Sequence, residues 1–180
     1  MKMAIIINGW DQRPDQEWLP WLAEELSKKG WTVELPAMPN SQMPKLEEWM
    51  DKLIALVPNA NTVLIGHSLA NALILKYMER KDILLKAAFL VAAWDYQLPD
   101  LLEEHGTFFK EGFDYQAIKA KNIPITIFQS TNDPYLDFSK GKQLAKKIGA
   151  TFIAVENAGH FGEKSGYKQF PDLLKLVERL

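Results

Sequence analysis

The chain of 180 residues contains no cysteine. This absence excludes disulfide bonds, thiolate metal sites and a cysteine nucleophile. It is compatible with a cytoplasmic protein, because disulfides are rare in that compartment, and we expect that location. Histidine is also scarce, with three residues in the whole sequence, so the choice of a catalytic histidine is narrow.

The sequence also lacks a strong excess of charge and a long apolar segment. Its 21 basic and 23 acidic residues give a net charge of -2, which provides no strong attraction to nucleic acid or to an acidic membrane surface. The first apolar run, "MAIII", stops at Asn8 and Gly9, too early for a signal-peptide core or a membrane span. We therefore expect binding to neither nucleic acid nor membranes, and a monomer is the default expectation.

Short apolar runs alternate with amphipathic stretches along the chain. Several runs are continuous rather than alternating, which is typical of strands buried on both faces. The strand-like runs are Met3–Ile7, Trp31–Leu35, Thr62–Ile65, Ala87–Ala92, Ile125–Phe128 and Thr151–Val155. The helix-like stretches are Glu17–Lys29, Leu46–Leu56, Leu69–Arg80, Phe138–Ile148 and Tyr167–Leu180. This order predicts one α/β domain over residues 1–180, with a mainly parallel six-stranded sheet and helices on both faces.

One long stretch, from Trp94 to Asn122, does not fit this alternation. It contains Gly106 and Gly112, and only Leu98–Glu104 has a short helical pattern. Long irregular connections within a compact domain are often lids or binding loops. A surface loop that merely covers an edge of the sheet is an equal alternative, so both interpretations stay open.

The segment "NTVLIGHSLANAL" places a serine where a strand-like run ends and a helix-like stretch begins. In a nucleophile elbow, a serine lies on such a turn, and its flanking residues must be small. Gly66 and Ala70 meet this need, although glycine is usual at the second position. Ser68 is therefore the candidate nucleophile, and the alternative is that Ser68 caps the following helix.

A serine hydroxyl needs a neighbouring base, and the three histidines differ in their suitability. His67 adjoins the serine, but neighbours on a sharp turn point in different directions. His105 lies beside two glutamates in the long irregular stretch. His160 follows the last strand-like run between Gly159 and Gly162, which indicates a tight loop. Parallel sheets bind their ligands at the carboxyl ends of the strands, so His160 is the candidate base. The alternative is that His160 is an ordinary histidine in a surface loop.

The third member of a triad is a carboxylate that orients the histidine. Asp133 follows Ile125–Phe128 and precedes Pro134, which favours a defined turn. Asp95, at the end of the preceding strand, is the main competitor, and Asp137 is better suited to begin the next helix. The resulting candidate triad occurs in the chain order of α/β-hydrolases: Ser68, Asp133 and His160.

The developing oxyanion needs backbone donors, and the substrate needs a pocket. One donor should be the Leu69 amide, directly after the nucleophile, and the loop in "IIINGW" supplies the Trp10 amide as the second. Trp10, Trp94 and Phe161 each lie beside a strand end, so we expect them to line the pocket. The alternative for each aromatic side chain is ordinary core packing.

Together these segments resemble the small serine hydrolases related to retinoblastoma-binding protein nine and the bacterial YdeN proteins. The resemblance covers nearly the whole chain and is carried by "IIINGW", "WLPWLAEEL", "LPAMPNSQMPKLEEWMDKL", "IGHSLA", "STNDPYLDF", "AGHFGEKSGY" and "FPDLLKLV". It implies a compact α/β-hydrolase fold without a large cap, with the triad at Ser68, Asp133 and His160. Two positions depart from the family: Ala70 replaces glycine, and Asn8 replaces the usual histidine.

The sequence thus predicts a serine hydrolase, without metal or cofactor, that cleaves small ester or amide bonds of an acyl substrate. The alternative is a non-catalytic protein-interaction module on a hydrolase scaffold, because a fold alone does not guarantee activity. The retinoblastoma-binding motif of the vertebrate relative requires a cysteine. Because this chain has no cysteine, it cannot bind a partner through that motif.

Overall fold

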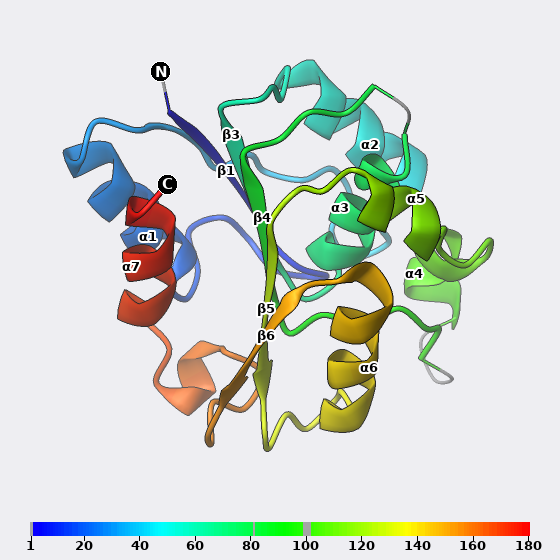
Figure 1. Cartoon of the computed structure of the whole chain (residues 1–180). Coiled ribbons are helices and arrows are strands. Elements are labelled where there is room, and N and C mark those ends of the chain that lie inside the picture. The colour runs from blue at the N-terminus through cyan, green and yellow to red at the C-terminus, as the bar shows by residue number, and fades with distance from the viewer. Residues whose placement is uncertain (1, 81, 99–101) are drawn as a thin grey trace.

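A parallel sheet of six strands forms the centre of the structure, a computed structural model that describes residues 2–80, 82–98 and 102–180 (Figure 1). The strands are β1 (Met3–Ile7), β2 (Thr32–Glu34), β3 (Thr62–His67), β4 (Ala87–Val91), β5 (Ile125–Ser130) and β6 (Thr151–Val155). Their order across the sheet is β2-β1-β3-β4-β5-β6, and every neighbouring pair is parallel. The predicted sheet is therefore confirmed.

Helices cover both faces of this sheet. They are α1 (Leu19–Lys28), α2 (Leu46–Ala55), α3 (Ala70–Met78), α4 (Leu102–Phe109), α5 (Tyr115–Ala120), α6 (Phe138–Ile148) and α7 (Pro171–Glu178), with a short 3-10 helix η2 at Glu163–Ser165. Helices α1 and α7 lie together on one face, and α2, α3 and α6 lie on the other (Figure 1). In the described part of the chain, every helix is too short or too polar to span a bilayer.

The central strands are apolar because both of their faces are covered. Every residue of β3 and β4 is buried, and so are Ala4–Ile7 in β1. Burial of one valine, leucine, isoleucine or phenylalanine side chain contributes about 1.5–3 kcal/mol, so these strands supply a large part of the apolar core. Strand β6 lies at an edge, and two of its five residues are exposed.

The stretch from Trp94 to Asn122 is more regular than the sequence predicts, because it contains α4 and α5. Gly106 lies inside α4, where a glycine is tolerated at a cost of about 1 kcal/mol. Asp114 caps α5 by accepting the Ala117 N–H at 2.9 Å. The predicted irregularity is therefore wrong. The predicted helix Leu98–Glu104 overlaps only the start of α4, and residues 99–101 lie outside the described part.

Candidate active site

Ser68 lies on a sharp turn between β3 and α3. Its φ angle is +56°, a left-handed conformation that non-glycine residues seldom adopt and that a nucleophile elbow requires. A Cβ at Gly66 would lie 2.6 Å from the Asn71 Oδ1 and 2.7 Å from the Ile74 Cδ1, so any larger residue two positions before the serine would displace these α3 side chains. The N-cap of α3 is Leu69, and no side chain caps this helix, which overturns the interpretation of Ser68 as a cap.

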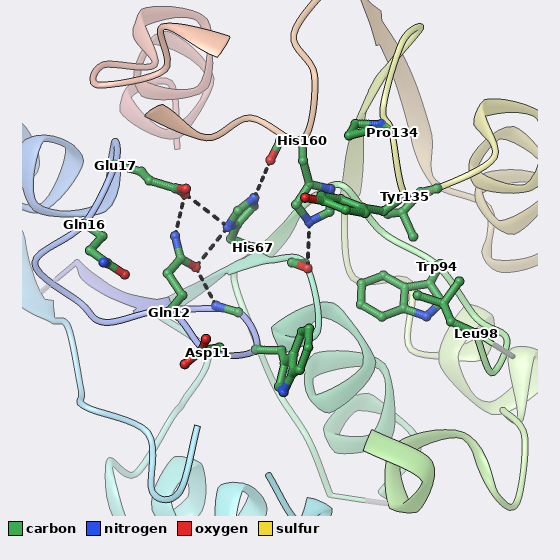
Figure 2. A pocket seen from close by; sticks show the side chains of 14 residues that line it. Asp11, Gln12, Gln16, Glu17, His67, Trp94, Leu98, Pro134, Tyr135 and His160 are labelled. Carbon is green, nitrogen blue, oxygen red and sulfur yellow. Dashed lines mark hydrogen bonds and ion pairs between the residues drawn. The ribbon is translucent and has the colours of Figure 1, made fainter. Parts of the chain in front are cut away.

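Three side chains from different loops form a hydrogen-bonded chain at the carboxyl edge of the sheet. The His160 Nε2 lies 2.8 Å from the Ser68 Oγ, and the His160 Nδ1 lies 2.8 Å from the Asp133 Oδ2 (Figure 2). The Asp133 side chain is fully buried, whereas that of His160 is 21% exposed. This is the arrangement in which a histidine can take the serine proton while a carboxylate fixes the ring.

Backbone and amide groups hold the carboxylate and the histidine loop in place. The Asp133 Oδ1 accepts the N–H groups of Tyr135 at 2.9 Å and Leu136 at 3.1 Å. The Asn132 Oδ1 accepts the Gly159 N–H at 2.8 Å and thereby joins the loop after β5 to the loop after β6. Asn132 has no motif of its own, so sequence reasoning missed it.

The competing aspartates make other interactions. The Asp95 Oδ2 pairs with the Lys147 Nζ at 2.6 Å and accepts the Tyr115 hydroxyl at 2.6 Å. Asp137 is the N-cap of α6 and accepts the Ser139 N–H at 2.7 Å, as predicted for a residue that begins a helix. Neither carboxylate contacts a histidine in the described part of the chain.

The two candidate oxyanion donors come from the loop after β1 and from the start of α3. Gly9 follows β1, and a Cβ there would lie 2.9 Å from the Ser68 Cβ, so glycine lets this loop approach the serine closely. The Trp10 amide comes next in the chain. Leu69 is the N-cap of α3, where an N–H lies outside the hydrogen-bond ladder of the helix.

A cavity of about 750 Å³ opens over the serine and histidine. Its labelled polar residues and its labelled apolar residues lie on opposite sides of the view (Figure 2). The apolar side is formed by Trp94, Leu98, Pro134, Tyr135 and Leu136. The polar side is formed by Asp11, Gln12, Gln16 and Glu17. Trp10 also lines the cavity, and its Nε1 donates to the Gln42 carbonyl at 2.9 Å, which fixes the indole ring.

Of the three predicted pocket residues, Trp10 and Trp94 line this cavity and Phe161 does not. The Phe161 ring is fully buried and stacks on Phe170, with the centroids 5.5 Å apart. Successive side chains on a tight turn point in different directions. His160 therefore faces the serine while Phe161 packs into the core, and the prediction for Phe161 is wrong.

His67, which sequence reasoning set aside, lies against the base. Its ring centroid is 5.2 Å from that of His160, and the residue is 3% exposed. Burial, reinforced by the neighbouring His160, lowers the pKa of His67 from 6.5 to about 3. The ring is therefore neutral at physiological pH.

This pKa makes stability depend on pH in a defined window. In the unfolded chain His67 binds a proton near pH 6.5, whereas in the folded chain it does so only near pH 3. The contribution of neutral His67 to the free energy of unfolding is thus complete above pH 6.5 and is lost as the pH falls toward 3. Between pH 8 and pH 5 we expect His67 to lower the free energy of unfolding by about 2 kcal/mol.

Urea unfolding of the wild type and of His67→Gln at pH 8, 6 and 5 measures this contribution. The variant should lose that part of the pH dependence, while the contributions of the other histidines cancel in the comparison. Equal pH dependence in the two proteins would contradict a neutral, buried His67.

A parallel α/β sheet with a serine elbow at the carboxyl end of its third strand defines the α/β-hydrolase class. Residues 4–179 match the sequence profile of the family described as serine hydrolase, and the chain belongs to this family. The protein is thus a serine hydrolase, which favours an enzyme over the alternative of a non-catalytic interaction module.

Individual relatives agree with this assignment. YdeN of Bacillus subtilis is 32% identical over 176 residues, which cover 94% of this chain and 91% of YdeN. Its crystal structure has a TM-score of 0.92 at 30% identity and covers 99% of this chain and 98% of that one. The serine hydrolase RBBP9 of Rattus norvegicus is 25% identical, covering 98% of this chain and 94% of the relative. These comparisons confirm the predicted family.

Proposed function

We propose that the protein cleaves small carboxylic ester or amide bonds through an acyl-enzyme formed on Ser68. The observation that carries this proposal is the chain of two 2.8 Å contacts that joins Ser68, His160 and Asp133. A serine is a weak nucleophile unless a base can accept its proton, and this geometry provides the base and its orienting carboxylate. The reaction needs no metal or cofactor.

In the first half of the proposed reaction, the Ser68 Oγ attacks the acyl carbon while the His160 Nε2 takes the hydroxyl proton. Asp133 accepts the Nδ1–H of the ring, which fixes the tautomer and stabilises the imidazolium that forms. The amides of Trp10 and Leu69 donate to the oxyanion. Fixed donors of this kind typically contribute about 2.7–4 kcal/mol each to the stability of the transition state.

In the second half, His160 returns its proton to the leaving group, and the alcohol or amine departs. His160 then takes a proton from a water molecule, which attacks the acyl-enzyme and releases the carboxylic acid. The volume of the cavity suits a small molecule. No lysine or arginine occurs among its described lining residues, and the wall of Trp94, Leu98 and Leu136 suits an apolar acyl group.

The acyl-chain preference tests this assignment of the apolar wall. Replacement of Trp94 with alanine should enlarge the acyl side of the cavity, because Trp94 lines it and is stacked on Phe109 at 5.5 Å. We expect the optimum of kcat/KM on a series of p-nitrophenyl esters to move to acyl chains longer than those that the wild type prefers.

Phe161→Leu is the matched control, because Phe161 is a buried aromatic residue outside the cavity. It should lower the melting temperature without moving the chain-length optimum. Failure of the wild type to hydrolyse any ester or amide of the series would contradict the proposed reaction. An unchanged optimum in Trp94→Ala would remove only the assignment of Trp94 to the acyl wall.

A further inference from the structure

Two loops of the active site contact His67, the buried residue next to the nucleophile. His67 is the last residue of β3, and its Nε2 lies 2.9 Å from the carbonyl oxygen of His160. On the other side of the ring, the Nδ1 lies 3.0 Å from the Gln12 Oε1 (Figure 2). His67 thus lies between the loop that carries the base and the loop that carries the Trp10 amide.

Gln12 is itself held so that its two amide atoms can be assigned. Its Oε1 accepts the Gly9 N–H at 2.7 Å, and its Nε2 donates to the Glu17 Oε2 at 2.5 Å. The Asn8 Nδ2 donates to the Gln12 carbonyl at 2.6 Å, which closes the loop from Asn8 to Gln12. Every oxygen atom that faces the His67 ring in these contacts is therefore an acceptor.

A neutral histidine has one N–H, so it can donate to only one of these oxygens. With the hydrogen on Nδ1, both the His67 Nε2 and the His160 carbonyl would lack this bond. With the hydrogen on Nε2, the His160 carbonyl is satisfied and the Gln12 Oε1 still accepts from Gly9. The one group that then lacks a hydrogen bond in these contacts is the His67 Nδ1, which faces the Gln12 Oε1 and, at 3.6 Å, the Glu17 Oε2. The second tautomer leaves fewer buried polar groups without a bond and is the one that the surroundings favour.

The carbonyl that His67 holds belongs to the catalytic base itself. The main chain of His160 fixes where its ring can lie, and the Nε2 of that ring is 2.8 Å from the Ser68 Oγ. A displacement of about 1 Å at such a contact can lower a rate on the order of 10²-fold. Gln12 acts in parallel on the other loop, because it holds the amide of Gly9 directly before Trp10.

We propose that His67 and Gln12 are positioning residues, and that the Nε2–H of His67 holds the His160 main chain at the distance from Ser68 that proton transfer requires. This inference rests on the proposed function. It assigns His67 no contact with the reacting atoms. His67 also lines the cavity, but it is only 3% exposed, so its effect should fall mainly on the chemical step rather than on substrate binding.

Three variants of His67 separate the two contacts of the ring. In His67→Gln, an amide nitrogen can reach about as far as Nε2, whereas in His67→Asn it reaches only as far as Nδ1. His67→Phe keeps a ring and removes both contacts. We expect kcat on a p-nitrophenyl ester to fall on the order of 10²-fold in the Asn and Phe variants, with KM changed less than about twofold. The kcat of His67→Gln should be at least about tenfold higher than that of the Asn and Phe variants.

Wild type and Ser68→Ala are measured in the same series, and circular dichroism and melting temperature report the folding of each variant. Equal kcat in the Gln and Asn variants would overturn the inference, and so would recovery in the Asn variant alone. If His67→Phe does not fold, the Gln and Asn variants decide by themselves. If the wild type has no activity, the proposed function is wrong. If the wild type is active and Ser68→Ala is inactive, the proposed function stands, and any disagreement in the His67 variants contradicts only the role proposed for His67.

Discussion

Replacement of Ser68 with alanine should abolish turnover of short p-nitrophenyl esters, with a loss of kcat on the order of a millionfold. The Ser68 Oγ is the only atom of the proposed triad that forms a covalent bond to the substrate. It lies 2.8 Å from the His160 Nε2. Alanine fits the same turn because it lacks only that oxygen. The loss should therefore occur without a change in melting temperature.

Ser27→Ala is the matched control for this substitution. Ser27 lies in α1, and its hydroxyl donates to the Ala23 carbonyl at 2.8 Å, away from the cavity. We expect the activity of this variant to equal that of the wild type. A Ser68→Ala protein that keeps a substantial fraction of wild-type kcat would show that another residue performs the attack.

Replacement of Asp133 with asparagine should lower kcat on the order of 10⁴-fold while the fold is retained. The remaining oxygen can still accept the N–H groups of Tyr135 and Leu136, as the Asp133 Oδ1 does. The amide nitrogen then takes the place of the Oδ2 and presents a hydrogen to the His160 Nδ1. The ring must carry its own hydrogen on Nε2, where it can no longer accept the proton of Ser68.

Asp95→Asn distinguishes the two candidate aspartates. Asp95 is also largely buried and also follows a strand, but it pairs with Lys147 and Tyr115. Its replacement should lower the melting temperature and leave kcat unchanged. A large loss of kcat in Asp95→Asn, together with a small one in Asp133→Asn, would mean that the triad has been assigned to the wrong carboxylate.

The strands could be predicted because burial on both faces requires continuous apolar runs, and β1 and β6 have the predicted bounds. Two other strands continue past their apolar residues. β3 runs on through Gly66 and His67, and β5 runs on through Gln129 and Ser130. These end residues are buried, with Gly66 against α3 and the Gln129 side chain against Gly141 of α6, and no local pattern reveals such contacts. Likewise, the sequence indicates only the start of α4, because this helix contains a glycine and packs on α2 and α3, which lie far away in the sequence.

The candidate triad could be predicted because the sheet topology brings the ends of β3, β5 and β6 to one edge, which limits the possible partners to a few residues. The supporting residues could not be predicted in this way. The Gln12 Oε1 lies 3.0 Å from the His67 Nδ1, and the Asn132 Oδ1 accepts the Gly159 N–H, so both amides contact residues far away in the sequence. An amide side chain has no spacing rule for such contacts. The side on which Phe161 packs likewise depends on the conformation of one turn.

Mapping of a covalent fluorophosphonate adduct tests the central role of Ser68 most directly. The probe reacts with a serine only where a base activates the hydroxyl and donors stabilise the tetrahedral centre. After proteolysis and mass spectrometry, we predict one modified peptide, with the added mass on Ser68. An unlabelled protein, or a label on another residue, would contradict the account.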